Sequence, residues 1–450
     1  MAVWSKVKLS NLYGAFRWDA ECYTPRMLRD QNALAKLETV KLGSVALVTD
    51  GQHGYHEVDE DSPVRHLTAK CVGPGVVVDK DADRLAMATH LANPESNLEV
   101  DDILLSTAGT IGEAGIVTAA LLPANIDQDV ARIKLAKDSP VHPYFVCAFL
   151  RSEYGQFQCE RGTTGQIQGH INLTALRQFD IPVLAQQRRV VDVMRTGIKK
   201  YLAASDAIAA AEARLMEALG LDRLDLSPQK CYTRRFSDLE AEARFDAEYF
   251  NPKYQRIIKK LRAGGRTLAD VAPLAQRPFD PALRPKGSTF RYIEIGSLTG
   301  DGEAEAESLH VADAPSRAAW IVKPGDIITS TVRPIRRLSA IVRDDQDGCV
   351  CSSGFACLTP KPGADGIEPE VLLTYLRLPI ICEILDLHCT ASMYPAIPED
   401  RLMRIPIVVP DTKTRKAVVA KVQEAITARA EAAQLLEEAK QTVERMIAAR

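Results

Sequence analysis

The sequence predicts an α+β protein of two similar globular units, each followed by a long helix, with the two helices packed antiparallel as a coiled coil. Two stretches place apolar residues at alternating spacings of three and four. Short motifs of the first half recur in the second half in the same order. Between them, β-rich runs bounded by Gly, Pro and Asp alternate with helical patterns. These observations favour a fold with an internal pseudo-twofold repeat.

The first long helix is expected over residues 186–220. Its apolar seam is Val191, Met194, Ile198, Tyr201, Ile208, Leu215 and Leu219. Ser205 and Glu212 break the alternation. Gly220 suits the left-handed residue just past a helix C-terminus. At about 1.5 Å per residue the helix would be on the order of 50 Å long, which suits a spacer.

A second seam follows the same rhythm over residues 412–450. It contains Val422, Leu436, Val443 and Met446, and Arg429 is the residue out of character. Neither helix has a nearby segment to cover its apolar stripe. The simplest solution is that the two helices pack on each other, antiparallel.

The duplication is carried by three pairs of motifs. Arg17-Trp-Asp-Ala-Glu21 recurs as Arg244-Phe-Asp-Ala-Glu248, at an offset of 244 − 17 = 227 residues. The other pairs are Asp102-Ile-Leu-Leu-Ser106 with Asp326-Ile-Ile-Thr-Ser330, and Ile181-Pro182 with Ile405-Pro406. We interpret the Arg-aromatic-Asp-Ala-Glu motif as structural, with its acids pairing the arginine or capping a helix and its ring in the core.

The predicted boundaries follow from these repeats. The segments are a first globular unit at 1–185, a central helix at 186–220, a polar linker at 221–243, a second globular unit at 244–411 and a C-terminal helix at 412–450. A curved antiparallel or mixed sheet is expected in each unit. Pro143 to Tyr154 and Pro369 to Leu387 are expected to form short amphipathic helices.

Composition is that of an ordinary globular protein. The 450 residues are 46% hydrophobic and 26% charged, with a net charge of −3. No apolar run reaches the roughly 18 residues that span a bilayer, and the N-terminus lacks a signal-peptide core, so we expect a cytoplasmic protein without membrane contact. The ten cysteines are scattered, which favours reduced thiols over a disulfide framework or a metal site.

The motifs of common catalysts are missing. The sequence has neither a dinucleotide fingerprint with an Asn-Pro-Pro-aromatic loop nor a phosphate-binding G-x-x-x-x-G-K-[ST] loop. The run from Gly109 to Gly115 is interpreted as a turn at a strand end, and Asp411 or Thr412 as a helix cap. Eight histidines form no set with convincing metal spacing. We therefore expect a binding protein that is not an enzyme, with no metal and no cofactor of its own.

Several motifs together resemble the specificity subunits of type I restriction-modification systems. They are Asp50-Gly-Gln-His53, the run Asp102-Ile-Leu-Leu-Ser-Thr-Ala-Gly-Thr-Ile-Gly112, and Thr163-Thr-Gly-Gln-Ile-Gln-Gly169 followed by Ile171-Asn-Leu173, Ile181-Pro182 and Gln187-Arg188. The second unit departs from this pattern, because Thr331-Val-Arg-Pro-Ile-Arg-Arg337 stands where the first has Gly-Thr-Ile-Gly. Such divergence is expected if each unit reads a different half-site.

The resemblance implies two target-recognition domains held apart by two spacer helices. It implies a subunit that binds double-stranded DNA at an asymmetric bipartite target with an unread gap. The family's partners are a DNA methyltransferase subunit, expected in two copies, and a motor-nuclease subunit for restriction. S-adenosylmethionine, ATP and Mg would belong to those partners. The implied setting is phage defence through DNA methylation.

Candidate DNA-contacting residues are those with paired donors or acceptors on loops. They are Gln52, His53, Tyr55, His56, Gln166 and Gln168 in the first unit, and Arg333, Arg336, Arg337 and Tyr394 in the second. The alternative is that they are ordinary polar turn residues, and the arginines could equally contact phosphates without reading sequence. Basic residues along the helices fit a solvated face as well as a docking surface.

Two other functions remain open. One is a specificity-like subunit of another methylation-based defence system, which would share the fold and differ in partner. The other is a coiled-coil scaffold with protein-binding domains and no DNA role. DNA affinity that falls steeply with salt would separate the DNA-binding functions from the scaffold.

Overall fold

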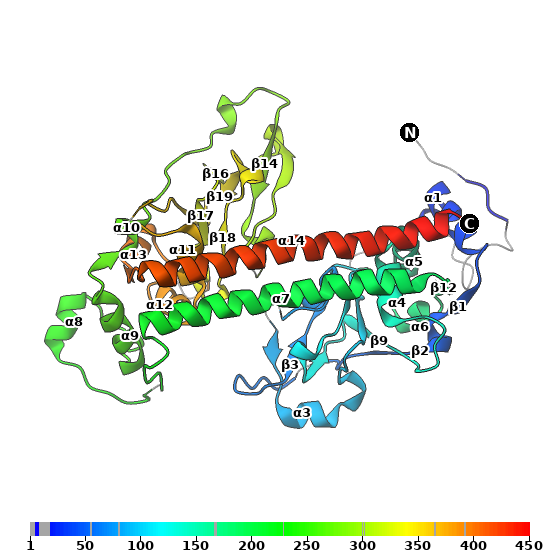
Figure 1. Ribbon diagram of the computed structural model, residues 1–450, viewed down its shortest axis with the longest axis horizontal. Coiled ribbons are helices and arrows are strands. Elements are labelled where there is room, and N and C mark those ends of the chain that lie inside the picture. The colour runs from blue at the N-terminus through cyan, green and yellow to red at the C-terminus, as the bar shows by residue number, and fades with distance from the viewer. Residues whose placement is uncertain are drawn as a thin grey trace. The chain divides into compact units, whose positions relative to one another are not determined.

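The computed structural model describes residues 5–8, 19–54, 56–79, 82–165, 169–227, 229–298, 300, 302–363, 366–390 and 393–450. The chain divides into two compact units (Figure 1). Unit 1 is Met1–Leu202 with Ala428–Arg450, and unit 2 is Ala203–Thr427. The long helices α7 (Gln187–Leu219) and α14 (Thr412–Ala448) therefore each contribute residues to both units.

Unit 1 is a mixed α+β domain. Its helices, besides α7 and α14, are α1 (Pro25–Leu34), α2 (Leu42–Val45), α3 (Met87–Ala92), α4 (Pro143–Arg151), α5 (Glu153–Gly162) and α6 (Leu173–Arg177). Its strands are β1 (Thr39–Lys41), β2 (Ala46–Asp50), β3 (Arg65–Leu67), β4 (Gly75–Val76), β5 (Asp83–Arg84), β6 (Ile103–Ser106), β7 (Ala114–Ile116), β8 (Ala124–Ile126), β9 (Val130–Leu135), β10 (Thr163–Thr164), β11 (His170–Ile171) and β12 (Asp180–Pro182).

The main sheet of unit 1 has the strand order β2-β9-β6-β7-β4. Its pairs are antiparallel except β4 with β7, which is parallel, so the sheet is mixed as predicted. A second sheet has the order β5-β3-β8, and β1 pairs with β12 at the point where the chain enters α7.

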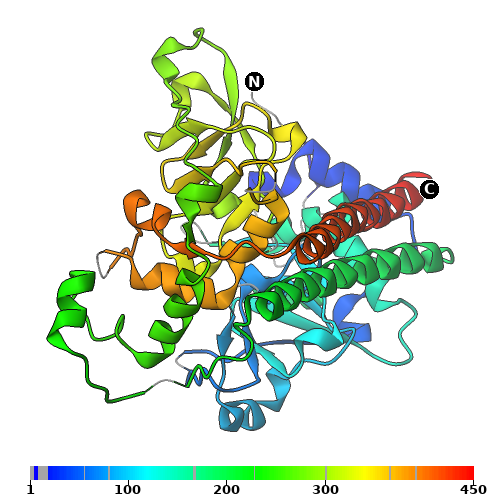
Figure 2. The ribbon, with the colours of Figure 1, turned by 60° about the vertical axis from the view of Figure 1, so that its left-hand side comes forward.

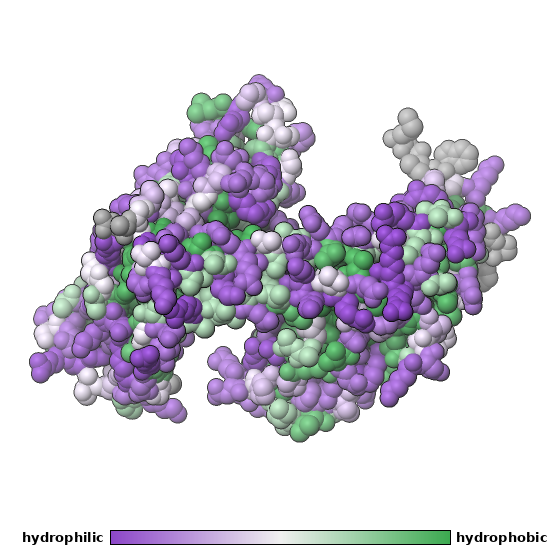
Figure 3. Space-filling view, viewed as in Figure 1, coloured by the Kyte–Doolittle hydropathy of each residue, from purple (hydrophilic) through white to green (hydrophobic). Residues whose placement is uncertain are grey.

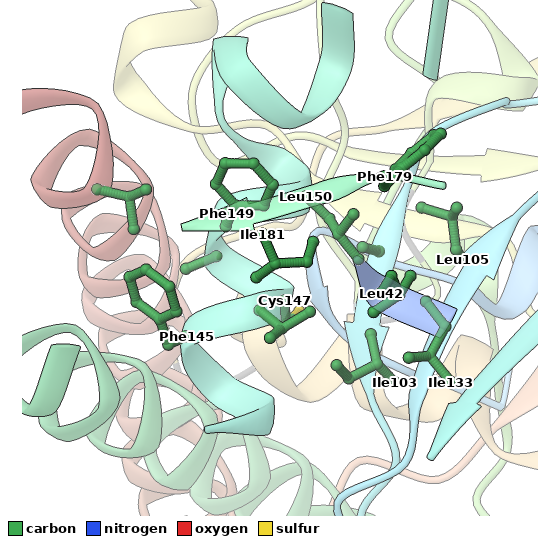
Figure 4. Packing of buried hydrophobic residues seen from close by; sticks show 14 of the residues in the cluster. Leu42, Ile103, Leu105, Ile133, Phe145, Cys147, Phe149, Leu150, Phe179 and Ile181 are labelled. Atoms are coloured by element: carbon green, nitrogen blue, oxygen red, sulfur yellow. The ribbon is translucent and has the colours of Figure 1, made fainter. Parts of the chain in front are cut away.

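The core of unit 1 lies between this sheet and α4 (Figure 4). Cys147 of α4 lies on the side of Ile103 and Ile133 of the sheet, whereas Phe145 of α4 points toward the long helices, and these four side chains are fully buried. All residues of α4 from 145 to 150 are buried, so the helix is covered on every side and is not amphipathic. His142 caps its N-terminus by accepting a hydrogen bond from the Tyr144 amide, at 3.2 Å.

Unit 2, like unit 1, is a mixed α+β domain. Its helices, besides α7 and α14, are α8 (Phe236–Glu242), α9 (Pro252–Arg262), α10 (Leu268–Val271), α11 (Pro369–Arg377), α12 (Pro379–Leu387) and α13 (Glu399–Met403). Its strands are β13 (Arg266–Thr267), β14 (Thr289–Ile293), β15 (Glu307–His310), β16 (Ala318–Ile321), β17 (Ile327–Ser330), β18 (Ser339–Ile341), β19 (Val350–Ser352), β20 (Phe355–Leu358) and β21 (Pro406–Ile407). The sheets have the orders β15-β14-β19-β16 and β18-β17-β20, and β13 pairs with β21.

Strand pairing follows the predicted repeat. In unit 1, β6 pairs antiparallel with both β7 and β9, and in unit 2, β17 pairs antiparallel with both β18 and β20. The pair β1/β12 has its counterpart in β13/β21, which also closes just before a long helix. The helix pair α4–α5 corresponds to α11–α12.

The segments predicted as short helices are helical with breaks. Residues 143–154 hold α4 and the start of α5, and residues 369–387 hold α11 and α12, because Ser152 and Leu378 leave the helical conformation. The segment 221–243, predicted as a polar linker, contains the short helix α8.

Within each unit, α7 packs against α14 (Figures 1 and 2). In unit 1, Met194 and Ile198 share a buried cluster with Leu436 and Val443. In unit 2, the later residues Ala211, Leu215 and Leu219 of α7 share a cluster with the earlier residues Val418 and Val422 of α14. Early residues of one helix thus meet late residues of the other, so the helices are antiparallel.

The seam residues named from the sequence are buried or half-buried. Val191, Met194, Ile198, Leu215, Leu219, Val422, Leu436 and Val443 are buried, and Tyr201, Ile208 and Met446 are half-buried. Three alanines of α7, at positions 204, 207 and 211, are buried as well. Gly220 has a φ of 62° and ends α7 in the left-handed conformation predicted for it.

Arg429 and Glu212, which break the seam pattern, each have a partner for their charge. Arg429 lies over the Tyr201 ring, with its guanidinium carbon 3.6 Å from the ring centroid. This cation–π contact keeps a charged residue on the seam without leaving it uncompensated. Glu212 forms an ion pair with Arg337 in unit 2. In the described part of the chain, no helix is both long and apolar enough to cross a membrane.

Candidate nucleic-acid interface

Backbone hydrogen bonds gather several loops of unit 1. The Thr107 amide, after β6, donates to the Asp129 carbonyl at 2.8 Å, and the Ile171 amide donates to the Thr107 carbonyl at 3.0 Å. The Gly51 amide donates to the Asp127 carbonyl at 3.1 Å. Segments 50–54, 107–113, 127–129 and 163–171, far apart in sequence, therefore meet. We call the described residues of these segments loop cluster 1.

Unit 2 builds an equivalent cluster. The Thr331 amide, after β17, donates to the Gly354 carbonyl at 2.9 Å, and the Ile397 amide donates to the Thr331 carbonyl at 2.9 Å. These bonds match the two bonds of Thr107 in unit 1. The Arg333 amide adds a bond to the Pro395 carbonyl at 2.8 Å. The described residues of segments 331–338, 352–354 and 389–397 form loop cluster 2.

The backbone of the first loop is alike in the two clusters although the residues differ. Gly109 and Gly112 have φ angles of 68° and 91° in cluster 1. In cluster 2, Arg333 and Arg337 have φ angles of 49° and 60°. Left-handed backbone costs a residue with a side chain roughly 1–2 kcal/mol. Unit 2 thus bears strain to place arginines where unit 1 has glycines, and such strain is concentrated at functional sites.

Gly51 explains why the Asp-Gly-Gln-His motif needs its glycine. A Cβ added at Gly51 would lie 1.7 Å from the carbonyl oxygen of Ile126. No residue other than glycine fits there, because the loop backbone runs directly against the strand end. This close approach positions Gln52 and His53 on the surface beside it.

The candidates in the first of these loops differ in exposure. Gln52 is half-buried and forms a backbone bridge with Asp127. The His53 side chain is 70% exposed, and its Nε2 lies 3.2 Å from Oδ2 of Asp50. His56 is half-buried, and its ring lies against that of His66, with the ring centroids 3.9 Å apart. Gln52 and His53 belong to the cluster, and His56 does not.

Three candidates lie outside the described residues. They are Tyr55, Gln166 and Gln168. The strands β10 and β11 that flank positions 166–168 pair antiparallel, with Thr163 opposite Ile171. This pairing ties the flanks of the segment to loop cluster 1.

Arg333 and Tyr394 form a pair in loop cluster 2. Arg333 is half-buried, and its guanidinium carbon lies 5.7 Å from the centroid of the Tyr394 ring. Tyr394 is 69% exposed, and its neighbour Met393 is 78% exposed. Arg336 is exposed on the same loop. Arginines beside an exposed aromatic ring suit contact with phosphates or with base edges.

Arg337 has partners within unit 2. Its Nε donates to the Arg377 carbonyl at 2.7 Å, and its Nη2 pairs with Glu212 of α7. Arg377 returns a hydrogen bond to the Arg337 carbonyl at 2.9 Å. The half-buried guanidinium thus fixes loop cluster 2 to α11 and α7. A contact of Arg337 with DNA stays a prediction.

Electrostatics near loop cluster 1 centre on buried carboxylates. Burial raises the pKa of Asp127 to about 6, and the neighbouring charge of Asp129 adds to the rise. Asp102, at the start of β6, accepts a hydrogen bond from Nε of Arg132 at 2.7 Å, and both side chains are almost fully buried. Burial also raises the pKa of Asp102. Asp326 has the same place in unit 2 and pairs with Arg277.

The Arg-aromatic-Asp-Ala-Glu motif is described only in unit 2, because Arg17 and Trp18 lie outside the described residues. Arg244 pairs with Asp246 at 2.6 Å, as predicted, and stacks over Tyr249 with 4.1 Å to the ring centroid. The prediction that the aromatic ring of the motif lies in the core was wrong for unit 2. Phe245 is 72% exposed, and Tyr249 fills the core instead.

The two motifs interpreted as structural are confirmed. The glycine-rich run joins β6 to β7 as a turn, and both Gly109 and Gly112 have positive φ. Asp411 caps α14, since its Oδ1 accepts the Thr414 amide at 3.0 Å and its Oδ2 accepts the Thr414 hydroxyl at 2.9 Å.

One group of side chains was not found from the sequence. His56, His66 and Asp83 approach one another in unit 1. Their spacing in sequence matches no metal-binding motif. The pairing of β3 with β5 places His66 opposite Asp83, and the bridge between Val58 and Leu85 holds the loop that carries His56.

The surface is mostly hydrophilic in the view of Figure 3, with small hydrophobic patches scattered over it. Two repeated α+β domains with antiparallel long helices, and a diverged loop cluster on each domain, define a duplicated architecture. No protein-family model matches the chain. A resemblance to one family comes from a comparison of sequences.

The chain is similar to the type I restriction enzyme HindI specificity subunit of Haemophilus influenzae. The two are 25% identical over 155 residues, which is 34% of this chain and 33% of that protein. The match thus spans about a third of the length of this curated relative. It confirms the resemblance to type I specificity subunits seen in the sequence motifs.

Solved structures of such subunits align with most of the chain. The S subunit of a type I system from M. genitalium is 13% identical, with a TM-score of 0.34, and the alignment covers 91% of this chain and 94% of that one. The HsdS subunit from Thermoanaerobacter tengcongensis is 16% identical, with a TM-score of 0.28, and the alignment covers 91% and 95%. These scores are low, and the sequence match carries the family resemblance.

Proposed function

We propose that the chain is a DNA-binding specificity subunit that directs a methyltransferase complex, and restriction with it, to an asymmetric bipartite target. It is not itself a catalyst in this proposal. The observation that carries the proposal is the pair of loop clusters. Their backbone hydrogen bonds are equivalent, whereas their exposed side chains differ.

Such a pair fits a protein that reads two different half-sites. Sequence is read by side chains that reach base edges, and phosphate contacts position them. Cluster 1 offers Gln52 and His53, and cluster 2 offers Arg333, Arg336 and Tyr394. An amide that matches adenine on one unit and arginines that match guanine on the other would select different bases. The target is therefore asymmetric, with a gap between the half-sites that is not read.

The long helices support a spacer role. Each is continuous across the boundary between the units, and each has a buried apolar seam within both units. A slip in their register would expose that seam, so the pairing resists change. We infer that they also dock the methyltransferase subunit. The duplication supports two copies of that subunit, because each unit offers an equivalent surface to one copy.

In this proposal the cofactors bind to the partner subunits. S-adenosylmethionine would bind to the methyltransferase subunit, and ATP and Mg to the motor-nuclease subunit. The chain works where the DNA is, in the cytoplasm, as part of a phage defence system.

The test is a genome-wide map of methylated bases. It compares cells that have the gene, cells that lack it, and cells that carry either Arg333→Ala or His310→Ala, all with the methyltransferase present. His310 is exposed in unit 2 and lies outside loop cluster 2. We expect a two-part asymmetric methylation motif with a fixed gap, and we expect it to disappear on deletion of the gene. In the Arg333 variant, methylation of the motif should weaken, or one half of the motif should lose sequence specificity. In the His310 variant the motif should be unchanged.

An unchanged map on deletion would refute the proposal. DNA affinity of the purified chain that does not depend on salt would favour a protein-binding scaffold. A lost motif without restriction of unmodified DNA would indicate a methylation-only defence system.

A further inference from the structure

Unit 1 contains a set of metal-ligating side chains apart from loop cluster 1. His56 lies on the loop after β2, His66 on β3 and Asp83 on β5. One ligand atom from each of the three lies within 4.8 Å of the other two. His66 and Asp83 are directly opposite in the antiparallel pair β3/β5, so the backbone fixes two of the three positions.

His66 is the residue that indicates a ligand. It is 2% exposed, and neither of its ring nitrogens hydrogen-bonds to any described part of the chain. A buried polar atom without a partner is costly and rare, and each such group needs an explanation. A metal ion bound by one nitrogen would supply the missing partner.

The other two side chains complete a site that solvent can reach. Nε2 of His56 lies 3.8 Å from Oδ2 of Asp83, and the two side chains are 22% and 59% exposed. The site thus has a buried wall at His66 and an open side at Asp83.

We propose that His56, His66 and Asp83 bind a zinc ion with water in the fourth position. Two imidazoles and one carboxylate are a donor set typical of zinc, and three protein ligands leave one position open. Tetrahedral ligands about 2.0–2.2 Å from zinc lie roughly 3.5 Å from one another. The half-buried side chain of His56 and the exposed side chain of Asp83 need to move by only about 1 Å to reach that geometry.

The ion would fasten a loop to a sheet. The segment 51–64 is held at Val58 by a bridge to Leu85. The Asp59 amide also donates to the Arg84 carbonyl at 2.9 Å, and the Ala86 amide donates to the Glu57 carbonyl at 3.1 Å. Zinc would add an attachment through the His56 side chain. Because Gln52 and His53 lie on the same segment, zinc would also order loop cluster 1, and this consequence rests on the proposed function.

The test is calorimetric titration of the metal-free full chain with ZnCl₂, without an affinity tag and without DNA. We expect one zinc per chain for the unmodified protein, and affinity lower by more than about tenfold for His56→Ala and for Asp83→Asn. Both changes are at solvent-accessible side chains, so the variants should fold. His310→Ala and Cys231→Ser are the controls, because both residues are exposed and could bind zinc adventitiously.

Hydrogen exchange gives a second readout. We expect zinc to slow amide exchange over residues 51–64 in the unmodified chain and not in Asp83→Asn. Absence of zinc binding, or equal binding by the unmodified chain and both ligand variants, would overturn the inference. Zinc binding lost only in Cys231→Ser would do the same. These measurements contain no DNA, so a failure of DNA binding would overturn the proposed function and leave the zinc site standing.

Discussion

Arg333 offers the sharpest test of loop cluster 2, because its backbone and its side chain make separate predictions. Its φ and ψ are 49° and 62°, in the left-handed region. Its guanidinium lies over the exposed ring of Tyr394. We compare Arg333→Ala, which removes the side chain and keeps the backbone strain, with Arg333→Gly, which removes both.

The two variants should differ in stability. Relief of the left-handed conformation is worth roughly 1–2 kcal/mol. The extra freedom of glycine in the unfolded chain costs about 0.5–1 kcal/mol of that gain. The lost contact with Tyr394 is common to both variants and cancels. Arg333→Gly should therefore be about 1 kcal/mol more stable than Arg333→Ala, which is a difference of about 2–4 °C in the Tm of a unit this size.

The two variants should not differ in DNA binding. If Arg333 contacts a phosphate, each variant lowers the salt dependence of log Kd by about one, uniformly over DNA sequences. If it contacts a base, each costs about 1–3 kcal/mol of binding free energy and relaxes one position of the target. Fluorescence anisotropy at several salt concentrations, with a target duplex and a scrambled one, separates these outcomes.

Two results would refute the reasoning. Equal Tm values for the alanine and glycine variants would show that the left-handed backbone carries no strain. DNA affinity equal to that of the unmodified chain in both variants, at every salt concentration, would remove Arg333 from the interface.

Three further predictions concern unit 2 and are measured by thermal unfolding. Arg337→Ala should lower the free energy of unfolding by about 2 kcal/mol, because it removes a charged hydrogen bond and leaves half-buried Glu212 unpaired. The same variant should keep the salt dependence of DNA binding, and a changed salt slope would contradict this. Ala211→Asp, which buries a charge in the helix seam, should cost about 3–5 kcal/mol, whereas Ala209→Asp on the exposed face should cost little; similar costs would count against the seam. Burial lowers the pKa of His388 to about 4, so below about pH 6.5 the unfolded chain binds a proton that the folded chain does not. Stability should therefore fall between pH 7 and 5 by more in the unmodified chain than in His388→Gln. An equal fall in both would exclude His388 as its cause.

Loop geometry explains why the candidate residues were only partly predictable. Glycines and arginines of the first loop occupy equivalent left-handed positions, which no comparison of residue types reveals. Arg333 and Arg337 look alike in sequence, yet one is directed at the exposed Tyr394 ring and the other is held by Glu212. Their difference depends on a hydrogen bond to α11 and an ion pair with α7, and both partners are distant in sequence.

The sequence by itself determined the features that depend on local periodicity and on repetition. The alternating apolar residues identified both long helices, and the packing of the two seams on each other was the simplest way to bury them. The recurrence of Asp102 and Asp326 at strand starts identified the duplication. Gly220 and Asp411 marked helix ends, since capping depends only on neighbouring residues.

Only the tertiary structure decided which side chains share a site. Phe245 belongs to a motif with an aromatic position, yet Tyr249 fills the core, because packing depends on neighbours that the motif does not contain. His56, His66 and Asp83 meet because β3 pairs with β5 in one register. Loop cluster 1 forms because Thr107 bonds to strands and loops far along the chain. Such contacts are set by strand register and loop closure, which depend on the whole domain and not on any local pattern.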